Sequence, residues 1–320
     1  MTKKWSSRLT FFAFVVLMVG LGSNDSLRGI FSTIFQEHFS LTTTQLGLIV
    51  TASYIGNLVF LLVGGNLSTR FSKKRVLQVL ILIWMAALAL FAFTSNYTVL
   101  LIGMALALGS STLLNTTMNL ITPLLFATAP GFFVNFLFFT QEIGTSGSQY
   151  ILGSHADGFA FWQHTNLVLL ILGAVAFVLL LFCNVPEEAA APADAPAQKG
   201  GYDWRIIVPY VLVFGFYFIA EHGVMNWMVA YGVDGLGLPQ ASAAKYLSVF
   251  FGGMMIGRLC LSPLVDKLGA LKSLAAFGGV SCVLYLIGSL GGAVTMPVWA
   301  ISGLSFSILY PTLVMSCLLY

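Results

Sequence analysis

The sequence predicts an all-α polytopic membrane protein, and two observations support that prediction. Hydrophobic residues make up 58% of the 320 residues, and charged residues make up 8%, against roughly 25% in soluble domains. The apolar residues also gather in runs long enough to cross about 30 Å of hydrocarbon, which needs roughly 20 helical residues. These runs lack the alternation of polar and apolar residues typical of membrane β-barrels, so we expect the spans to be helices.

Ten apolar runs follow one another along the chain, and each is predicted to form one membrane-spanning helix. They cover residues 9–35, 44–65, 75–94, 97–126, 131–153, 163–183, 205–231, 241–264, 271–291 and 297–319. The basic start of the chain resembles a signal peptide, but no A-x-A-like cleavage site follows and the apolar run continues. We therefore interpret this stretch as the first helix, retained in the protein.

The basic residues lie mostly on one side of the membrane in this arrangement. Counting from a cytoplasmic N-terminus, only Arg28 and Lys245 of the 14 lysines and arginines fall away from the inner side. This positive-inside pattern predicts a protein of the inner (plasma) membrane with a cytoplasmic N-terminus. A basic surface for nucleic acid would not explain the asymmetry, so no nucleic-acid partner is expected.

One long polar segment divides the chain. Residues 184–204 read NVPEEAAAPADAPAQKGGYDW, rich in alanine and proline and without helical periodicity. This composition predicts a cytoplasmic linker. It would separate an N-terminal six-helix bundle, residues 1–183, from a C-terminal bundle, residues 205–320.

The two halves resemble each other at a constant offset of 197 residues. Gly56 then matches Gly253, and Leu67 matches Leu264. Two parallel six-helix halves are a transporter architecture with the substrate site between them at the midplane. Because a duplicated six-helix unit predicts twelve spans, we interpret the ten-helix chain as C-terminally truncated, with the second bundle incomplete.

Short basic loops in the two halves share a motif. GNLSTRFSKKRVL, residues 65–77, resembles the G-x-L-a-D-R-x-G-R-K-x-x-L signature of the major facilitator superfamily, and SPLVDKLGALKSL, residues 262–274, is its second copy. The first copy has Thr69 and Ser72 where the family has aspartate and glycine. The resemblance implies that these loops gate the conformational change. The residues that it assigns to gating are Gly65, Arg70, Lys73, Lys74, Asp266, Lys267 and Gly269.

Other stretches are similar to the fucose:proton symporter branch of that superfamily. They are SNDSLRGIF in helix 1, LNTTMNLITP in helix 4 and FYFIAEHGVMNW in helix 7. In helix 4, Asn119 matches the branch, whereas Asn115 replaces its glutamate. The resemblance implies alternating access, in which two helical bundles rock around a central cavity lined by helices 1, 4, 7 and 10.

Two carboxylates are expected at similar depths in equivalent helices. Asp25 lies 17 residues beyond Arg8. Glu221 lies 16 residues beyond Arg205. Intramembrane charges usually face a cavity or pathway, and burial disfavours the charged form, so both residues are candidate proton carriers. The alternatives are a neutralising pair between Asp25 and Arg28 at i+3 and, for Glu221, a partner on another helix.

The remaining substrate-binding or proton-coupling candidates are polar or aromatic residues within the predicted spans. They are Asn24, Arg28, Asn115, Asn119, Glu142 and Trp227. The amides of helix 4 and the carboxylate of helix 5 would otherwise be interhelical hydrogen-bond anchors. Trp227 would stack on a sugar ring or anchor the helix at the membrane interface. The histidines are spaced unlike metal ligands, and no metal or cofactor is expected.

The sequence therefore predicts a secondary active transporter, not an enzyme. We expect a monomer that moves a small polar solute, a sugar, across the lipid bilayer by proton-coupled symport. Two alternatives stay open, namely a proton-coupled efflux antiporter and a non-transporting membrane sensor of transporter ancestry. Helix 5 contains GTSGSQYILG, without the proline of the efflux signature, which disfavours the first. The sequence has neither an H-E-x-x-H nor a G-x-S-x-G motif to suggest an enzyme.

Overall fold

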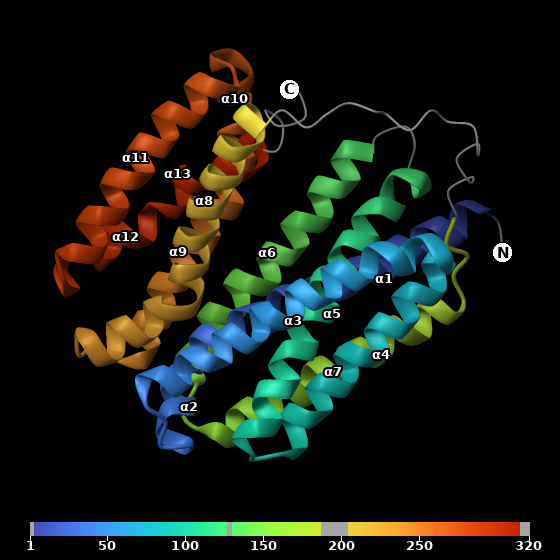
Figure 1. The fold of residues 1–320 in the computed structure, drawn as a ribbon, viewed down its shortest axis with the longest axis horizontal. Helices are drawn as coiled ribbons and strands as arrows, with labels where there is room; N and C mark the ends of the chain where they lie inside the picture. Colours follow the sequence, from blue (N-terminus) through green and yellow to red (C-terminus); the bar gives the residue numbers. More distant parts are fainter. Residues whose placement is uncertain (1–2, 127–129, 187–203, 314–320) are drawn as a thin grey trace. The chain divides into compact units, whose positions relative to one another are not determined.

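A computed structural model describes residues 3–126, 130–186 and 204–313 (Figure 1). The first half contains α1 (Lys3–Ile30), α2 (Ser32–His38), α3 (Thr43–Arg70), α4 (Lys73–Phe93), α5 (Tyr97–Leu125), α6 (Pro130–His155) and α7 (Phe159–Leu181). The second half contains α8 (Trp204–Ala230), a π-helical turn (Tyr231–Gly235), α9 (Gln240–Cys260), α10 (Ser262–Leu268), α11 (Ala270–Leu290), a 3-10 turn (Ala293–Thr295), α12 (Met296–Ile301) and α13 (Gly303–Phe306). The described residues contain helices and no strand, which confirms the predicted all-α class.

Eight helical segments within the described ranges are long and apolar enough to cross a membrane, and one of them, Ala293–Leu313, includes the 3-10 turn, α12 and α13. They correspond to eight of the ten predicted runs. The other two runs, 131–153 and 241–264, form α6 and α9, which have 26 and 21 residues but are not among those eight. The number of ten spans therefore stays a prediction.

The chain folds into two compact units, Met1–Glu188 and Ala189–Tyr320. The first unit holds α1 to α7, and the second holds α8 to α13. Most of the predicted linker, residues 187–203, lies outside the described residues. The domain limits inferred from the sequence thus remain a proposal.

Helix α1 packs mainly against α6 and α7 in the first unit, and it also contacts α5. Its contact with α6 is a direct approach of two backbones, because a Cβ atom on Gly144 would lie 2.9 Å from the carbonyl carbon of Val19. The Ser23 hydroxyl donates a hydrogen bond to the Gly144 carbonyl at 3.3 Å. In return, the Thr145 hydroxyl donates to the Gly22 carbonyl at 3.2 Å. Small residues and side-chain hydroxyls therefore hold α1 and α6 together, as is usual for helices in membranes.

The matched glycines Gly56 and Gly253 make corresponding helix contacts in the two units. A Cβ atom on Gly56 of α3 would lie 2.6 Å from the Cα atom of Ala105 in α5. A Cβ atom on Gly253 of α9 would lie 3.1 Å from the backbone nitrogen of Leu304 in α13. In the first unit α3 therefore meets α5, and in the second α9 meets α13, at a residue without a side chain. This agreement supports the duplication inferred from the sequence.

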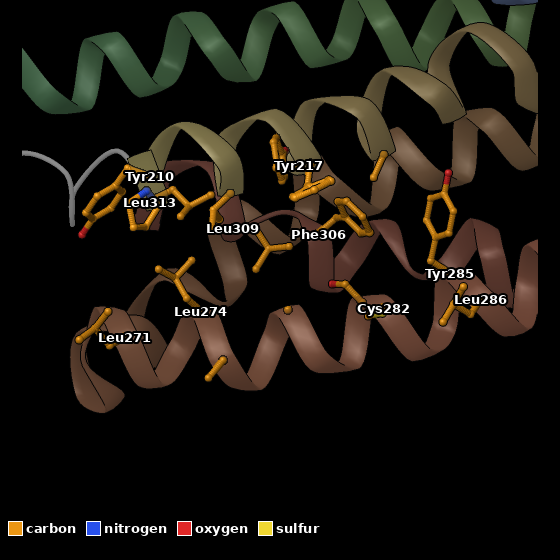
Figure 2. A pocket seen from close by; sticks show the side chains of 17 residues that line it. Tyr210, Tyr217, Leu271, Leu274, Cys282, Tyr285, Leu286, Phe306, Leu309 and Leu313 are labelled. Carbon is orange, nitrogen blue, oxygen red and sulfur yellow. The ribbon is translucent and has the colours of Figure 1, made fainter. Parts of the chain in front are cut away.

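An apolar groove of about 750 Å³ lies in the second unit (Figure 2). Tyr210 and Tyr217 of α8 line one side, and Leu274, Cys282 and Leu286 of α11 line the other. In the first unit, α7 packs against both α1 and α4, the helices that correspond in order to α8 and α11. Among the described residues of the second unit, no helix holds the position that α7 holds in the first.

Gly144 and Gly147 of α6 offer a matched test of the α1–α6 contact. We expect Gly144→Leu to lower the free energy of unfolding by about 1–3 kcal/mol, because the new side chain meets the backbone of Val19. A Cβ atom on Gly147 would meet nothing within 4 Å, so Gly147→Leu should have little effect. Thermal unfolding of the purified protein in detergent measures both. Equal unfolding temperatures for the two variants would contradict the packing described.

Candidate functional site

Asp25 is the one partly exposed residue between Gly20 and Ser32, where every other side chain is buried. The Ser111 hydroxyl of α5 lies 3.4 Å from each carboxylate oxygen of Asp25 and donates to it. The Asn24 amide nitrogen donates to one of these oxygens, also at 3.4 Å. Asp25 thus lies within a membrane-spanning helix, in contact with polar donors and still open on one side.

Arg28 follows Asp25 by about one helical turn and is only 4% exposed. Its guanidinium carbon lies 5.9 Å from the centroid of the Tyr54 ring on α3. This distance is within the range of a cation–π interaction, which is strongest where water is excluded. Asp25 and Arg28 therefore have polar or aromatic partners on neighbouring helices, Asp25 on α5 and Arg28 on α3.

A ladder of three side-chain amides connects α5 to α6. Asn119 donates from its amide nitrogen to the Asn115 side-chain oxygen at 2.7 Å. The Asn115 amide nitrogen in turn donates to the Gln141 side-chain oxygen, also at 2.7 Å. All three side chains are only partly exposed. The structure therefore brings together Asn115 and Asn119, as their i, i+4 spacing predicts, and adds Gln141 from another helix.

Gln141 is a site residue that sequence reasoning missed. Its neighbour Glu142 drew attention because a carboxylate in a membrane helix is rare, whereas a glutamine is a weaker signal. Both residues are partly exposed on α6. Pairing of Gln141 with Asn115 depends on how α5 and α6 cross, which the local sequence does not specify.

Glu221 lies in the second unit within a cluster of charged and phenolic groups. It is partly exposed on α8, where the Tyr217 hydroxyl interacts with its carboxyl group and the Arg258 guanidinium of α9 exerts a direct electrostatic influence. Tyr310 interacts electrostatically with both Glu221 and Arg258. Arg258 is thus a charged neighbour of Glu221 on another helix, a possibility that the sequence left open. Trp227 lies six residues further along α8 and is partly exposed.

The predicted gating loops show different local structures in their two copies. Ser72 caps the start of α4, since its hydroxyl accepts a hydrogen bond from the Arg75 backbone nitrogen at 3.4 Å. At the matching position before α11, Gly269 has φ of 81°, a left-handed conformation that favours glycine. Serine and glycine thus begin equivalent helices in two different ways, which explains the departure of Ser72 from the family signature.

Lys74 binds the end of α7 within the first unit. Its ammonium nitrogen donates to the carbonyl oxygens of Leu181 at 3.1 Å and Cys183 at 2.6 Å. A cation at a helix C-terminus stabilises the unpaired carbonyl groups there. Lys73 is partly exposed and Lys267 is exposed, whereas the burial of Gly65, Arg70 and Asp266 lies outside what the structure describes. Gating by these residues remains a prediction.

Comparison with known proteins identifies the family. The sequence profile of the Major Facilitator Superfamily matches residues 10–319. The chain belongs to this superfamily. It is 24% identical to the L-fucose-proton symporter of Escherichia coli (strain K12), over 90% of this chain and 75% of that protein. It is also 24% identical to the cis,cis-muconate transport protein of Acinetobacter baylyi, over 86% of this chain and 70% of that protein.

A solved structure supports the same fold. The Major Facilitator Superfamily transporter FucP in its outward conformation superposes with a TM-score of 0.67 and 20% identity, covering 96% of this chain and 84% of that one. These findings confirm the predicted two-bundle family fold and the resemblance to fucose permease. The protein is a multi-pass membrane transporter and not an enzyme.

Replacing Lys74 should weaken the first unit. Lys74→Met removes two charge-assisted hydrogen bonds to the end of α7, so we expect the free energy of unfolding to fall by about 1–3 kcal/mol. Arg75→Met is the matched control, because Arg75 is an exposed cation at the next position. Thermal unfolding at low and high salt measures both. A loss of similar size in the two variants would contradict the capping role.

Proposed function

We propose that the protein imports a small neutral sugar together with protons, by alternating access of its two units. The observation that carries this proposal is the setting of Asp25. It is a partly exposed carboxylate in an otherwise buried stretch of a membrane-spanning helix, and hydroxyl and amide donors contact it. Intramembrane carboxylates in transporters commonly form proton relays. The similarity to a protein described as an L-fucose-proton symporter supports the same activity.

The amide ladder supplies the groups that would recognise a sugar. Both of its hydrogen bonds have the same donor-to-acceptor direction: Asn119 donates to Asn115, and Asn115 donates to Gln141. The Asn119 oxygen is buried without a hydrogen-bond partner among the described residues, so it can accept. At the other end the Gln141 amide nitrogen can donate. Sugar hydroxyls donate and accept at once and therefore suit both ends of the ladder.

A small organic acid is the second candidate solute. Arg28 is a buried guanidinium, a group that binds carboxylates well, and one relative is described as a cis,cis-muconate transport protein. Against this, Asp25 lies one turn away and would repel an anionic solute. A neutral solute therefore fits the local charge better than an acid does.

Transport into proteoliposomes tests the proposal. Labelled neutral sugars and dicarboxylates are offered outside, with the outside buffer either acidic or equal in pH to the inside. We expect a sugar to accumulate only under the inward proton gradient and to leave again when a protonophore is added. Accumulation of dicarboxylates alone would select the organic-acid alternative. Gradient-driven export would indicate an antiporter, and no movement of any solute would favour the sensor.

Asp25 and Arg28 can be tested together. A neutralising pair predicts that Asp25→Asn/Arg28→Gln restores transport lost in either single variant, because no charge is then stranded in the membrane. We expect instead that the double variant folds but fails to accumulate solute, since an amide cannot carry a proton.

Uptake assays at matched expression decide between these two outcomes for Asp25 and Arg28. Glu37→Gln, which neutralises an exposed carboxylate on α2, is the control and should transport normally. Restored uptake in the double variant would show that Asp25 and Arg28 are only structural.

A further inference from the structure

We propose that the groove between α8 and α11 receives one apolar membrane-spanning helix of a partner polypeptide, which packs there as α7 packs in the first unit. The groove has a volume of about 750 Å³, and most side chains that line it are apolar or aromatic (Figure 2). Helices in a bilayer are held together by close packing, so an apolar groove along two such helices suits a third. The inference concerns assembly of the protein and does not rest on the proposed transport of sugar.

The position of α7 in the first unit is the template. Helix α7 contacts both α1 and α4. A Cβ atom on Gly20 of α1 would lie 3.0 Å from the Leu172 side chain of α7 and 3.0 Å from the Trp84 ring of α4. A Cβ atom on Gly173 of α7 would lie 3.1 Å from the same ring. Trp84 therefore fills the space that two glycines leave between the three helices.

The offset of 197 residues that relates the two halves assigns a counterpart in the groove to these positions on α1 and α4. Gly20 corresponds to Tyr217, and Trp84 corresponds to Ser281. Both counterparts line the groove. The large ring thus lies on the α8 side and the small residue on the α11 side, the reverse of the first unit. A helix in the groove should therefore carry a small residue opposite Tyr217 and a large one opposite Ser281, in place of the Leu172–Gly173 order of α7.

Other pairs of corresponding residues differ in how far they are covered. Leu77 and Leu88 of α4 are fully buried in the first unit. Their counterparts on α11, Leu274 and Tyr285, line the groove and are partly exposed. Buried residues make up 44% of the apolar window of α4 but 17% of that of α11. Within the described residues, the second unit therefore leaves uncovered the face of α11 that corresponds to a covered face of α4.

The 320 residues offer no spare helix for the groove. The two longest stretches outside the described ranges are 187–203 and 314–320. The first contains Glu187, Glu188 and Asp194 as well as two prolines, and the second has seven residues, against the roughly 20 that a span needs. The long helices of the described ranges pack within their own units, so a second copy would have to release one of them. A partner polypeptide that brings its own helix would leave both bundles intact.

Two peptides of equal composition test the order of small and large residues. One has the sequence of α7, and the other carries Leu172→Gly/Gly173→Leu, which places the small residue opposite Tyr217. We expect the reversed peptide to bind the 320-residue protein in lipid nanodiscs at least about tenfold more tightly than the unchanged one, because leucine would press on the Tyr217 ring. A photoreactive leucine in each peptide marks the side chains that it meets, and mass spectrometry should find the adducts on α8 and α11.

Gly278 and Gly279 of α11 provide matched variants of the protein. Gly278 lines the groove, and a Cβ atom there would have the Leu309 side chain at 3.9 Å as its nearest neighbour, an ordinary contact. A Cβ atom on Gly279, which does not line the groove, would meet nothing within 4 Å. Gly278→Phe should fill the groove and weaken binding of the reversed peptide at least about tenfold, whereas Gly279→Phe should leave it unchanged. Circular dichroism checks that both variants fold.

The outcomes separate a partner helix from the other occupants of the groove. Saturable binding of the reversed peptide that Gly278→Phe removes and Gly279→Phe retains supports the inference. No saturable binding, equal binding of the two peptides, or binding that Gly278→Phe leaves unchanged overturns it. Dimers of the protein alone that Gly278→Phe dissociates would also overturn it, because a second copy would then be the occupant. These measurements use neither solute nor proton gradient, so a failure of the proposed sugar transport does not affect them.

Discussion

The first unit depends on the direct contact between the backbones of α1 and α6. In a bilayer, apolar side chains gain little by leaving lipid for protein, so helices associate through close packing and hydrogen bonds. Gly144 allows the approach, and the hydroxyls of Ser23 and Thr145 hydrogen-bond across it. Asp25 lies two residues beyond Ser23, and Gln141 lies one turn before Thr145. The position of both polar groups therefore depends on how closely the two helices pack.

The two units use different chemistry around their polar residues. In the first, Asp25 and the amide ladder are contacted by hydroxyl and amide groups, which form many hydrogen bonds of moderate strength. In the second, the Tyr217 hydroxyl interacts with the Glu221 carboxyl group, and Arg258 is an electrostatic neighbour of both Glu221 and Tyr310. Both units thus place a carboxyl group among polar partners inside a membrane-spanning helix, and the amide ladder belongs to the first.

Much of the fold could be predicted from the sequence, because hydrophobic run length and charge placement act locally. Nine of the ten runs contain a long helix, and the last, 297–319, contains the short helices α12 and α13. The loop motif, together with the Asn24–Asp25 pair, indicated the family. The contacts of Gln141 with Asn115 and of Tyr310 with Tyr217 could not be found in this way, since they depend on how helices cross.

Asn115 has a thermodynamic consequence for the transport cycle. Where the fucose-type branch has a glutamate, this chain has an amide, which keeps the same charge and the same donors and acceptors at every physiological pH. Solute affinity at the ladder would then be equal on the acidic and the alkaline side of the membrane. The proton gradient would then act on the transport cycle only through carboxyl groups outside the ladder, such as those of Asp25 and Glu221. Selectivity and driving force would thus be separate properties of the molecule, and each could be changed without the other.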